Sequence, residues 1–558
     1  MLATLLIWAY SFTIFYLYGY GGLVFLKRIF HLQDGFTLSF TIVAIMGAAV
    51  LTTLTSFLSL MMPLGGEAAI LILLGGVLIA ILTQPWKNFA FPAYHLLVLI
   101  LFVIVTIAVL ENATYKPTNY DTALYHAQAI HWSESYRVVP GLVNIHNRLA
   151  INSSWLVLVA SLSFAFLGLR SFHLTNSIIL LITMIYFGEG FQGLIQKQVT
   201  ISNIVKAVLF FLPLYLYASD LSSPGTDLPP ALLTWVVMAL ILEKVQKRGL
   251  DFDLYSIVVF ILSIFAVTIK LSTLPLSGLA LLMMIQQLWN KGRQRSAALA
   301  GTALIILLPW FLRNIILSGY LIFPISQIDL FSFDWKYPLD ATAAVQNATL
   351  WFNRFPSNTE EYVGMQATQW IPLWFHQLAR GQKILVVVAL LSPAGIPVYF
   401  LSKMDQRLST GASIAFLVNY IGIFFWLFTA PILRFGYAYL FMSIILGGAP
   451  IILMLTNLTM NGTAIVSFPL VILAILFQLY ILTATTSIST LSQRVFLPAD
   501  YPSSNTQPCP IDHTTFYCAR TLGLCSYEAF PCIPKPRTDV EMRGTSLQDG
   551  FRTAVQKP

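Results

Sequence analysis

The sequence predicts an all-α polytopic membrane protein, and three observations support that class. Of its 558 residues, 57% are hydrophobic and only 10% are charged, with a mean hydropathy of +0.76. Soluble domains carry about 25% charged residues, so this composition excludes a soluble enzyme and a disordered hub. About fourteen apolar segments have the length, roughly 20 residues, that a helix needs to cross a bilayer. The four cysteines lie together in a polar C-terminal tail, which predicts disulfides in an oxidising compartment.

The basic excess of the chain is explained by its membrane character. The net charge of +8 comes from 31 basic and 23 acidic residues. Such an excess is expected of a membrane protein, whose cytoplasmic loops are rich in Lys and Arg. The sequence also has no water-exposed stretch that combines basic and aromatic residues, as a nucleic-acid-binding surface would. We therefore expect no nucleic-acid partner. Residues 1–26 lack a basic start and a small-residue cleavage site, which favours a retained first helix over a signal peptide.

The apolar segments divide the chain into three membrane parts and three external parts. Four spans are expected in residues 1–110, at 2–25, 36–60, 66–84 and 89–110. Six are expected in 172–317, at 172–192, 204–219, 229–246, 253–271, 273–289 and 296–317. Four are expected in 383–483, at 383–402, 410–429, 435–454 and 464–483. The external parts are two loops, 111–171 and 318–382, and the cysteine-containing tail, 484–558.

Lys and Arg in short loops predict the orientation. Lys27 and Arg28 place the first loop inside, so the N-terminus is expected outside. The apolar segment 152–169 decides the orientation of the later loops. If it spanned the membrane, ten basic residues of those loops would lie on the external side. If it lies along the outer membrane surface as a juxtamembrane helix, all of them lie inside. We therefore expect a cytoplasmic (inner) membrane protein with both termini and the tail on the external, periplasmic side.

This topology gathers the unusual ionisable residues on the external face. Charged groups at the edge of a bilayer are costly, so they suggest function by default. Asp121 is expected in the first turn of a helix capped by Asn119, with Tyr125 one turn later on the same face. Its carboxylate would either stabilise the positive N-terminal end of the helix dipole or act as a general base in a reaction. His126 and His131 would accompany it, but their spacing of five splays them around a helix and does not favour metal binding.

Further external residues each have a structural and a functional interpretation. Arg148 either solvates a loop or lines a polar cavity, and Asp227 is either a helix N-cap or a second acid. Lys270 either snorkels to the interface or faces a substrate. For two proline-flanked groups we favour phosphate binding, because Arg presents a planar set of donors to phosphate oxygens. These groups are Arg313 with Asn314 and Arg434 with Tyr437.

Four stretches resemble a known superfamily. They are Asn119-Tyr-Asp121-Thr-Ala-Leu-Tyr125, Ser161 to Gly168, Pro309-Trp-Phe-Leu-Arg313-Asn314, and Ala430 to Phe435. On these the chain resembles the GT-C superfamily, membrane-embedded glycosyltransferases that use polyprenyl-phosphate sugars, and its layout is similar to the protein O-mannosyltransferases and the lipid A aminoarabinose transferase. The tail, with its cysteines followed by Arg543-Gly-Thr-Ser-Leu-Gln-Asp549-Gly-Phe551, resembles a group of large bacterial membrane proteins. Two features depart from GT-C sequences: Asp121 has no acidic neighbour before Glu134, and four helices precede the first loop instead of one.

The resemblance implies a sugar transfer from a polyprenyl-phosphate donor to an external hydroxyl of a glycan, lipid or protein, with inversion. Asp121 would be the general base, and His126 would orient it or titrate near neutral pH. Arg313, Arg434 and Lys270 would hold the lipid phosphate. No redox or nucleotide cofactor is implied, although Asp121 and Asp227 are residue types that can hold a divalent cation. The rival hypotheses are a lipid-linked oligosaccharide flippase and a non-catalytic envelope assembly protein whose tail, with Cys509, Cys518, Cys525 and Cys532, docks a partner.

Overall fold

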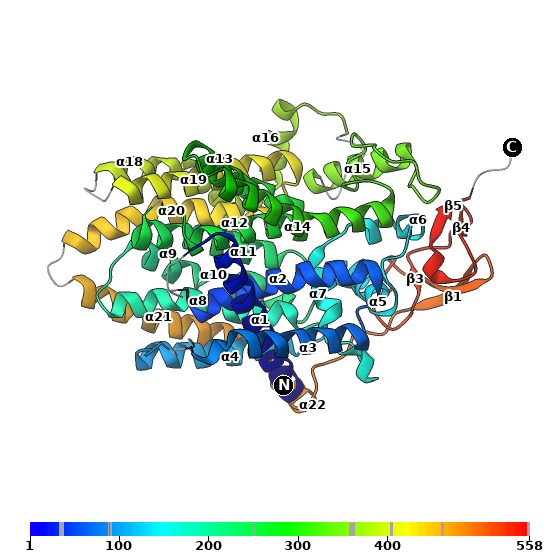
Figure 1. Ribbon diagram of the computed structural model, residues 1–558, viewed down its shortest axis with the longest axis horizontal. Coiled ribbons are helices and arrows are strands. Elements are labelled where there is room, and N and C mark those ends of the chain that lie inside the picture. Colours follow the sequence, from blue (N-terminus) through cyan, green and yellow to red (C-terminus); the bar gives the residue numbers. More distant parts are fainter. Residues whose placement is uncertain are drawn as a thin grey trace.

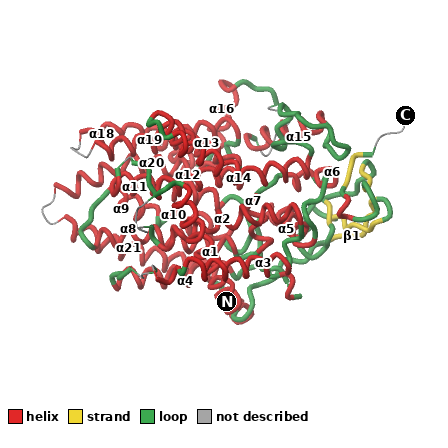
Figure 2. Tube along the Cα trace, viewed as in Figure 1, coloured by secondary structure: helices red, strands yellow, loops and turns green. Residues whose placement is uncertain are grey.

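Long helices dominate the computed structural model of the chain. It describes all residues except 33–37, 88, 90–91, 169, 250, 356–362, 402–405, 459–461 and 555–558. The long helices run mainly along the longest dimension of the molecule, and the strands occupy one end of it (Figures 1 and 2). A mostly helical protein is therefore confirmed, whereas the strands of the tail correct the prediction of an all-α chain, because short polar segments there pair into sheets.

Thirteen segments of the described chain are long and apolar enough to cross a membrane. In order they are α1 (Leu2–Ile29), α2 (Phe40–Met61), α3 (Gly66–Thr83), α4 (Leu96–Ala113), α8 (Thr175–Ile195), α9 with α10 (Ile201–Leu209 and Leu212–Tyr217), α11 (Leu228–Arg248), α13 (Leu274–Trp289), α14 (Arg293–Ser318), α17 with α18 (Arg380–Leu391 and Ile396–Leu401), α19 (Gln406–Thr429), α20 (Leu433–Leu458) and α21 (Gly462–Thr485). The fourteenth expected span, 253–271, is α12 (Leu254–Ile269), an apolar helix of 16 residues. Its length is slightly below the roughly 17–25 residues of most spans.

The bundle has a buried centre and an apolar rim. The most hydrophobic stretch of α11 is completely buried, whereas most of the apolar side chains of α3 are exposed, as in a helix that faces lipid. Glycines allow α1 and α2 to approach closely: a Cβ atom on Gly19 would lie 1.9 Å from the Val43 carbonyl oxygen, and one on Gly47 would lie 1.6 Å from that of Phe15. Small residues are the usual means of close packing between membrane helices.

The segment 152–169 differs in part from its expected place. It forms α7 (Ser154–Ser161) and a short 3₁₀ turn, so it is too short to span, as expected. Every residue of α7 is buried, however, and the helix packs on α2 and on α5 (Ala127–Ser135). The apolar side chains of α7 therefore pack against other helices of the protein, which the expected contact with lipid at the membrane surface did not include. Among the described residues of the segment, Phe166 and Leu167 are the large apolar ones that are exposed.

The remaining helices lie outside the long bundle segments. The first loop holds a π-helical turn, Thr122–His126, which continues into α5, and then α6 (Leu142–Ile145). The second holds α15 (Leu339–Arg354) and α16 (Ala367–Gln377), and α22 (Ile488–Arg494) begins the tail. The N-terminal amine donates to the Arg494 carbonyl oxygen at 2.5 Å, so the chain start and the start of the tail lie at the same place.

The tail contains two small sheets. In the first, β1 (Thr506–Ile511) pairs antiparallel with β2 (Thr514–Ala519), which pairs parallel with β3 (Cys532–Ile533). In the second, β4 (Val540–Met542) pairs antiparallel with β5 (Phe551–Thr553). The predicted disulfides are present. Four cysteines allow three pairings, and the structure has Cys509–Cys518 and Cys525–Cys532. Small modules with little core commonly depend on such cross-links.

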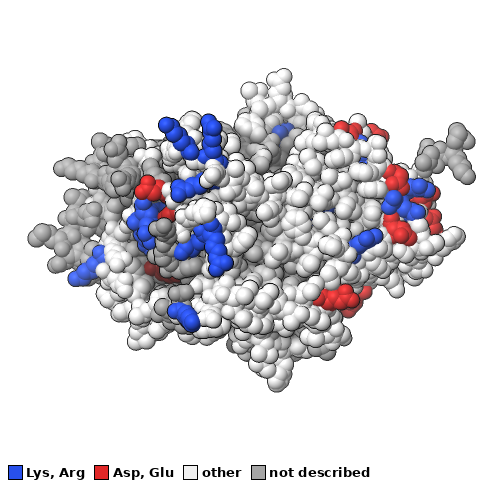
Figure 3. Space-filling view, viewed as in Figure 1, with Lys and Arg blue, Asp and Glu red and all other residues white. Residues whose placement is uncertain are grey.

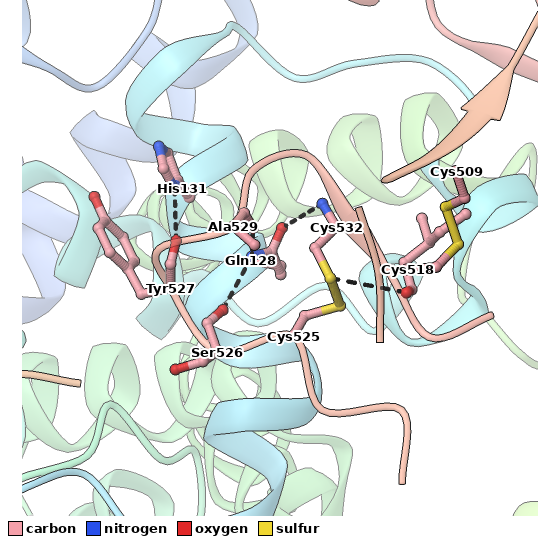
Figure 4. Close-up of a disulfide and its surroundings, with 10 residues drawn as sticks. Gln128, His131, Cys509, Cys518, Cys525, Ser526, Tyr527, Ala529 and Cys532 are labelled. Carbon is pink, nitrogen blue, oxygen red and sulfur yellow. Dashed lines mark hydrogen bonds between the residues drawn. A yellow bond between two sulfur atoms is a disulfide. The ribbon is translucent and has the colours of Figure 1, made fainter. Parts of the chain in front are cut away.

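The loop closed by Cys525 and Cys532 packs directly on α5 and the turn before it. Figure 4 shows Gln128 inside this loop, where it donates to the carbonyl oxygens of Ser526 and Ala529 and accepts from the Cys532 amide. The amides of Cys525 and Ser526 both donate to the Ala123 carbonyl oxygen at 2.9 Å. The disulfide-closed loop therefore fixes the helix that carries the first-loop polar residues.

Replacing Cys525 and Cys532 together with Ser is expected to destabilise the docked tail by about 2–3 kcal/mol, because the open loop gains conformational entropy in the unfolded state. Tryptic cleavage after Arg520 in the purified full chain should become faster. The Cys509 and Cys518 double Ser variant is the matched control, since its loop does not bond to Ala123. A cleavage rate equal to that of the wild type in the Cys525 and Cys532 variant would contradict the proposed role of this loop.

Charge is distributed unequally along the molecule. On the face shown in Figure 3, Lys and Arg predominate over the half away from the strands, whereas both signs mix at the strand end. This is an asymmetry of the kind that the positive-inside rule describes. It separates a basic end of the bundle from the end that carries the tail.

Candidate functional site

Asp121 lies where the sequence predicts, in the first turn of the helix that ends as α5. Asn119 is the cap: its side-chain oxygen accepts from the amides of Asp121 at 3.0 Å and Thr122 at 3.3 Å. Its side-chain nitrogen donates to Asp220 at 2.8 Å. The π-helical turn at Thr122–His126 then adds a residue to the helical turn. Such turns are rare and frequently occur at functional sites.

Four residues from distant parts of the sequence form what we call the charge cluster: Asp121, Asp227, Lys270 and Arg434. The Arg434 Nη2 atom lies 3.1 Å from Asp121 Oδ2, and its Nε atom lies 3.1 Å from Asp227 Oδ2. Lys270 forms an ion pair with the other oxygen of Asp227. Arg434 therefore bridges two carboxylates, and the formal charges of the cluster cancel.

Helix ends bring the charge cluster together. Asp227 precedes α11 as its N-cap but makes no side-chain capping bond, so its carboxylate is committed to the two cations. Lys270 ends α12, and its ammonium lies 3.5 Å from the ring centroid of Phe435. Arg434 lies in the first turn of α20, where the helix dipole disfavours a cation. Two carboxylates and a neighbouring aromatic ring offset that penalty.

The members of the charge cluster differ in exposure. The side chain of Asp227 is 12% exposed and that of Arg434 is 46% exposed, so Arg434 is the member that a ligand reaches most easily. Burial alone would raise the pKa of Asp227, but Lys270 and Arg434 outweigh it and hold that pKa below its usual value. The two cations therefore favour the anionic form of Asp227, which in turn positions them.

His126 and Tyr125 lie beside the cluster but make no hydrogen bond to Asp121 within the described part of the chain. The His126 side chain is 2% exposed, and its Nδ1 atom lies 3.3 Å from the Thr122 hydroxyl. Burial lowers the pKa of His126 to about 4, which corrects the expectation that it titrates near neutral pH. Its Nε2 atom is buried without a partner among the described residues. Burial likewise raises the pKa of Tyr125 above its usual value.

The neutral state of His126 predicts an acid-sensitive contribution to stability. Between pH 6.5 and about 4 the unfolded state binds a proton that folded His126 does not, so the free energy of unfolding falls as the pH falls through this window, by at most about 3 kcal/mol. His126→Gln should weaken this pH dependence, measured by thermal unfolding of the purified chain. His513→Gln, at an exposed histidine, is the control. Identical pH slopes for His126→Gln and the wild type would contradict the assignment.

Several residues predicted for the site lie elsewhere. Arg313 bonds to Ser59 and Asn152, and Asn314, buried on the same helix, has a side-chain nitrogen without a partner in the described structure. Tyr437 stays near the charge cluster, three positions after Arg434 on α20, and its ring centroid lies 5.8 Å from that of Phe441. Two others remain near the first loop: the Arg148 guanidinium lies 6.0 Å from the Tyr125 ring centroid, and His131 stacks on Tyr527 and Phe530 of the tail.

Two residues next to the charge cluster are absent from the sequence-based site. Asp220 accepts from Asn119, the cap of the helix that carries Asp121, and Phe435 lies under Lys270. Asp220 has a signal in the sequence, since it is the second acid of the same polar loop as Asp227. Phe435 has none, because an aromatic residue in an apolar helix is indistinguishable from a lipid-facing one.

A large cavity of about 1010 Å³ adjoins this region. Its lining includes Thr118 and Ser219, the chain neighbours of Asn119 and Asp220. Three cations also line it: Arg494, which pairs with Glu111 at 2.7 Å, Arg170, which pairs with Asp500 at 3.2 Å, and exposed Lys116. The cavity has the size of a small-molecule site and is lined with polar and apolar side chains alike.

Metal binding finds little support in these side chains. The residues that the structure describes contain no group of three or more His, Cys, Asp or Glu side chains arranged to hold a metal ion. Asp121 and Asp227, the two acids considered for a divalent cation, are both bonded to Arg434. A cation at this position would have to displace the arginine.

Comparison with known proteins gives one result. The chain belongs to the family described as Domain of unknown function (DUF8201), which matches residues 1–441. That match includes all four members of the charge cluster and stops before the tail. No curated protein matches the chain, and no solved structure matches it.

Proposed function

We propose that this member of the DUF8201 family is a membrane-embedded glycosyltransferase of the GT-C type. It would move a sugar from a polyprenyl-phosphate donor to a hydroxyl acceptor, with inversion, on the external side of the membrane. The observation that carries the proposal is the bridge from Asp121 to Asp227 through Arg434, with Lys270 beside it. A base and two phosphate-binding cations thus meet where the ends of α11, α12 and α20 converge.

The ion pairs suggest how donor binding would prepare the base. Without a ligand, the carboxylate of Asp121 is bound to half-exposed Arg434. The anionic oxygens of the donor phosphate would compete with Asp121 for the Arg434 guanidinium. A guanidinium binds phosphate well because several of its N–H groups donate to the phosphate oxygens at once. Phosphate binding to Arg434 would therefore release Asp121 to accept a hydrogen bond from the acceptor hydroxyl.

The transfer step then balances within these groups. The acceptor oxygen attacks the anomeric carbon from the face opposite the phosphate, and the bond from that carbon to the phosphate oxygen breaks with its electron pair on the phosphate. The hydroxyl proton passes to Asp121. Arg434 and Lys270 stabilise the charge that grows on the leaving phosphate, the effect that usually contributes most to such reactions. Asp227 keeps both cations in place.

The large cavity supplies space for one of the substrates. It lies between α4, α10 and α22, next to the Asn119–Asp220 contact. Apolar residues such as Leu216 and Leu497 line it together with the polar ones. Such a lining suits a lipid-linked or amphipathic molecule whose polar group faces the charge cluster.

The proposal is tested with the purified full chain in liposomes that contain polyprenyl phosphates carrying radiolabelled hexose, pentose or aminopentose. At least one donor should release polyprenyl phosphate, with the label transferred to an added glycan, lipid or protein acceptor. Movement of an intact donor across the bilayer without bond cleavage would instead establish a transporter. Neither cleavage nor movement with any donor would refute both functions.

A further inference from the structure

Arg313 is a buried cation without an acidic partner among the described residues. Its guanidinium donates to two neutral oxygens: Nη1 to the Ser59 hydroxyl at 2.6 Å and Nε to the Asn152 side-chain oxygen at 3.2 Å. The residue is only 7% exposed. A buried guanidinium is costly unless an anion or several acceptors compensate it, and two neutral acceptors leave other donors of the five unused.

A cavity of about 30 Å³ adjoins Arg313. Two other buried side chains that line it, Ser153 and Trp132, have polar atoms without a partner among the described residues, the Ser153 hydroxyl and the Trp132 indole nitrogen. They are 6% and 2% exposed. Exposed Arg137 also lines the cavity, and no ion pair of its side chain is found in the described part of the chain. Residues with unused hydrogen-bond donors therefore line this cavity.

We propose that this cavity is an anion-binding site that takes the oxygens of a phosphate group. Arg313 would form its floor and Arg137 its mouth, with the Ser153 hydroxyl and the Trp132 indole as further donors. The volume admits one or two oxygen atoms, since a single water needs about 10–15 Å³ measured in this way. The remainder of the phosphate group then lies at the mouth, next to Arg137.

This site is separate from the charge cluster. The two share no residue, and Trp132 follows Asp121 by eleven positions, or about 15 Å along the helix axis. The GT-C resemblance implies that Arg313 and Arg434 hold one phosphate, but at this separation they would bind different anions. The inference does not depend on the proposed transfer reaction, because it concerns binding alone.

The phosphate group would belong either to a soluble molecule or to an anionic lipid, and the experiment distinguishes the two. Thermal unfolding of the purified full chain is measured with increasing inorganic phosphate against chloride at matched ionic strength. In parallel, native mass spectrometry counts phosphatidylglycerol molecules retained from nanodiscs. A ligand that binds the folded state raises the unfolding midpoint. A phosphate response alone identifies a soluble ligand, and selective lipid retention identifies a headgroup.

Three variants make the test specific. Arg137→Gln and Ser153→Ala should each weaken the response, by about tenfold in apparent affinity for Arg137→Gln, which removes a charge-assisted bond at the mouth. Arg520→Gln, at an exposed tail arginine, should leave it unchanged. These sites are chosen because Arg313 is buried and its replacement would also disturb folding. The inference is overturned if neither phosphate nor lipid binds, or if Arg137→Gln binds like the wild type.

Discussion

Replacing Asp121 with Asn is expected to lower the rate of sugar transfer by about 10²–10⁴-fold, the usual contribution of a general base. The variant keeps the size of the side chain and an oxygen that can still accept from Arg434, so the helix and the cluster should stay intact. Asp121→Ala should lose a similar factor. The measurement is transfer from a radiolabelled polyprenyl-phosphate sugar to the acceptor identified with the wild type.

The way in which the loss divides between kcat and KM tests the ion pair as well as the base. Because the Asp121 carboxylate occupies Arg434 in the ligand-free protein, its removal should leave the KM for the donor unchanged or lower it, while kcat falls. Asp539→Asn is the matched control, since Asp539 is also paired with an arginine, Arg537, but lies in the tail. Full transfer activity in both Asp121 variants would show that Asp121 is not the general base.

The membrane architecture could be predicted from the sequence because it follows from hydrophobicity and length. The described chain has thirteen helical segments long and apolar enough to span, against about fourteen expected, and two of the expected spans are each divided between two helices. Apolar segments in a bilayer become helical because a helix satisfies its own backbone hydrogen bonds. The packing of α7 could not be predicted in the same way. An apolar segment of that length packs equally well on the membrane surface or among helices, and its burial depends on contacts with α2 and α5.

The four members of the charge cluster are among the residues that the sequence singles out, but the sequence does not predict which of them pair or that Arg313 lies apart from them. Asp121 and its Asn119 cap are local features, so their positions follow from the sequence. The contacts of Arg434 with Asp121 and Asp227 join residues hundreds of positions apart, and only the packing of α11 and α20 creates them. The pKa of His126 depends in the same way on burial, which composition does not reveal for a polar residue in a loop.

Replacing Arg434 with Gln should reduce kcat/KM for the donor by about 10²–10³-fold, the loss expected when one stabilising group of a developing anion is removed. In contrast to the Asp121 variants, the KM for the donor should rise, because Lys270 alone remains to bind the phosphate. Arg434→Lys should recover only part of the activity, since an ammonium cannot bridge two carboxylates with a fixed planar set of donors. Arg537→Gln, in the tail, controls for the loss of an arginine that pairs with an acid.

The double variant with Asp121→Asn and Arg434→Gln tests whether the two residues act as one unit. If Arg434 both holds Asp121 in the resting protein and binds the phosphate in the reaction, the two losses will not add, because each single change already disrupts the same transition state. Additive losses would indicate independent roles, and wild-type kcat/KM in Arg434→Gln would exclude Arg434 from phosphate binding. Since Asp227 stays paired with Lys270 in every variant, the comparison isolates the contact that Arg434 makes with Asp121.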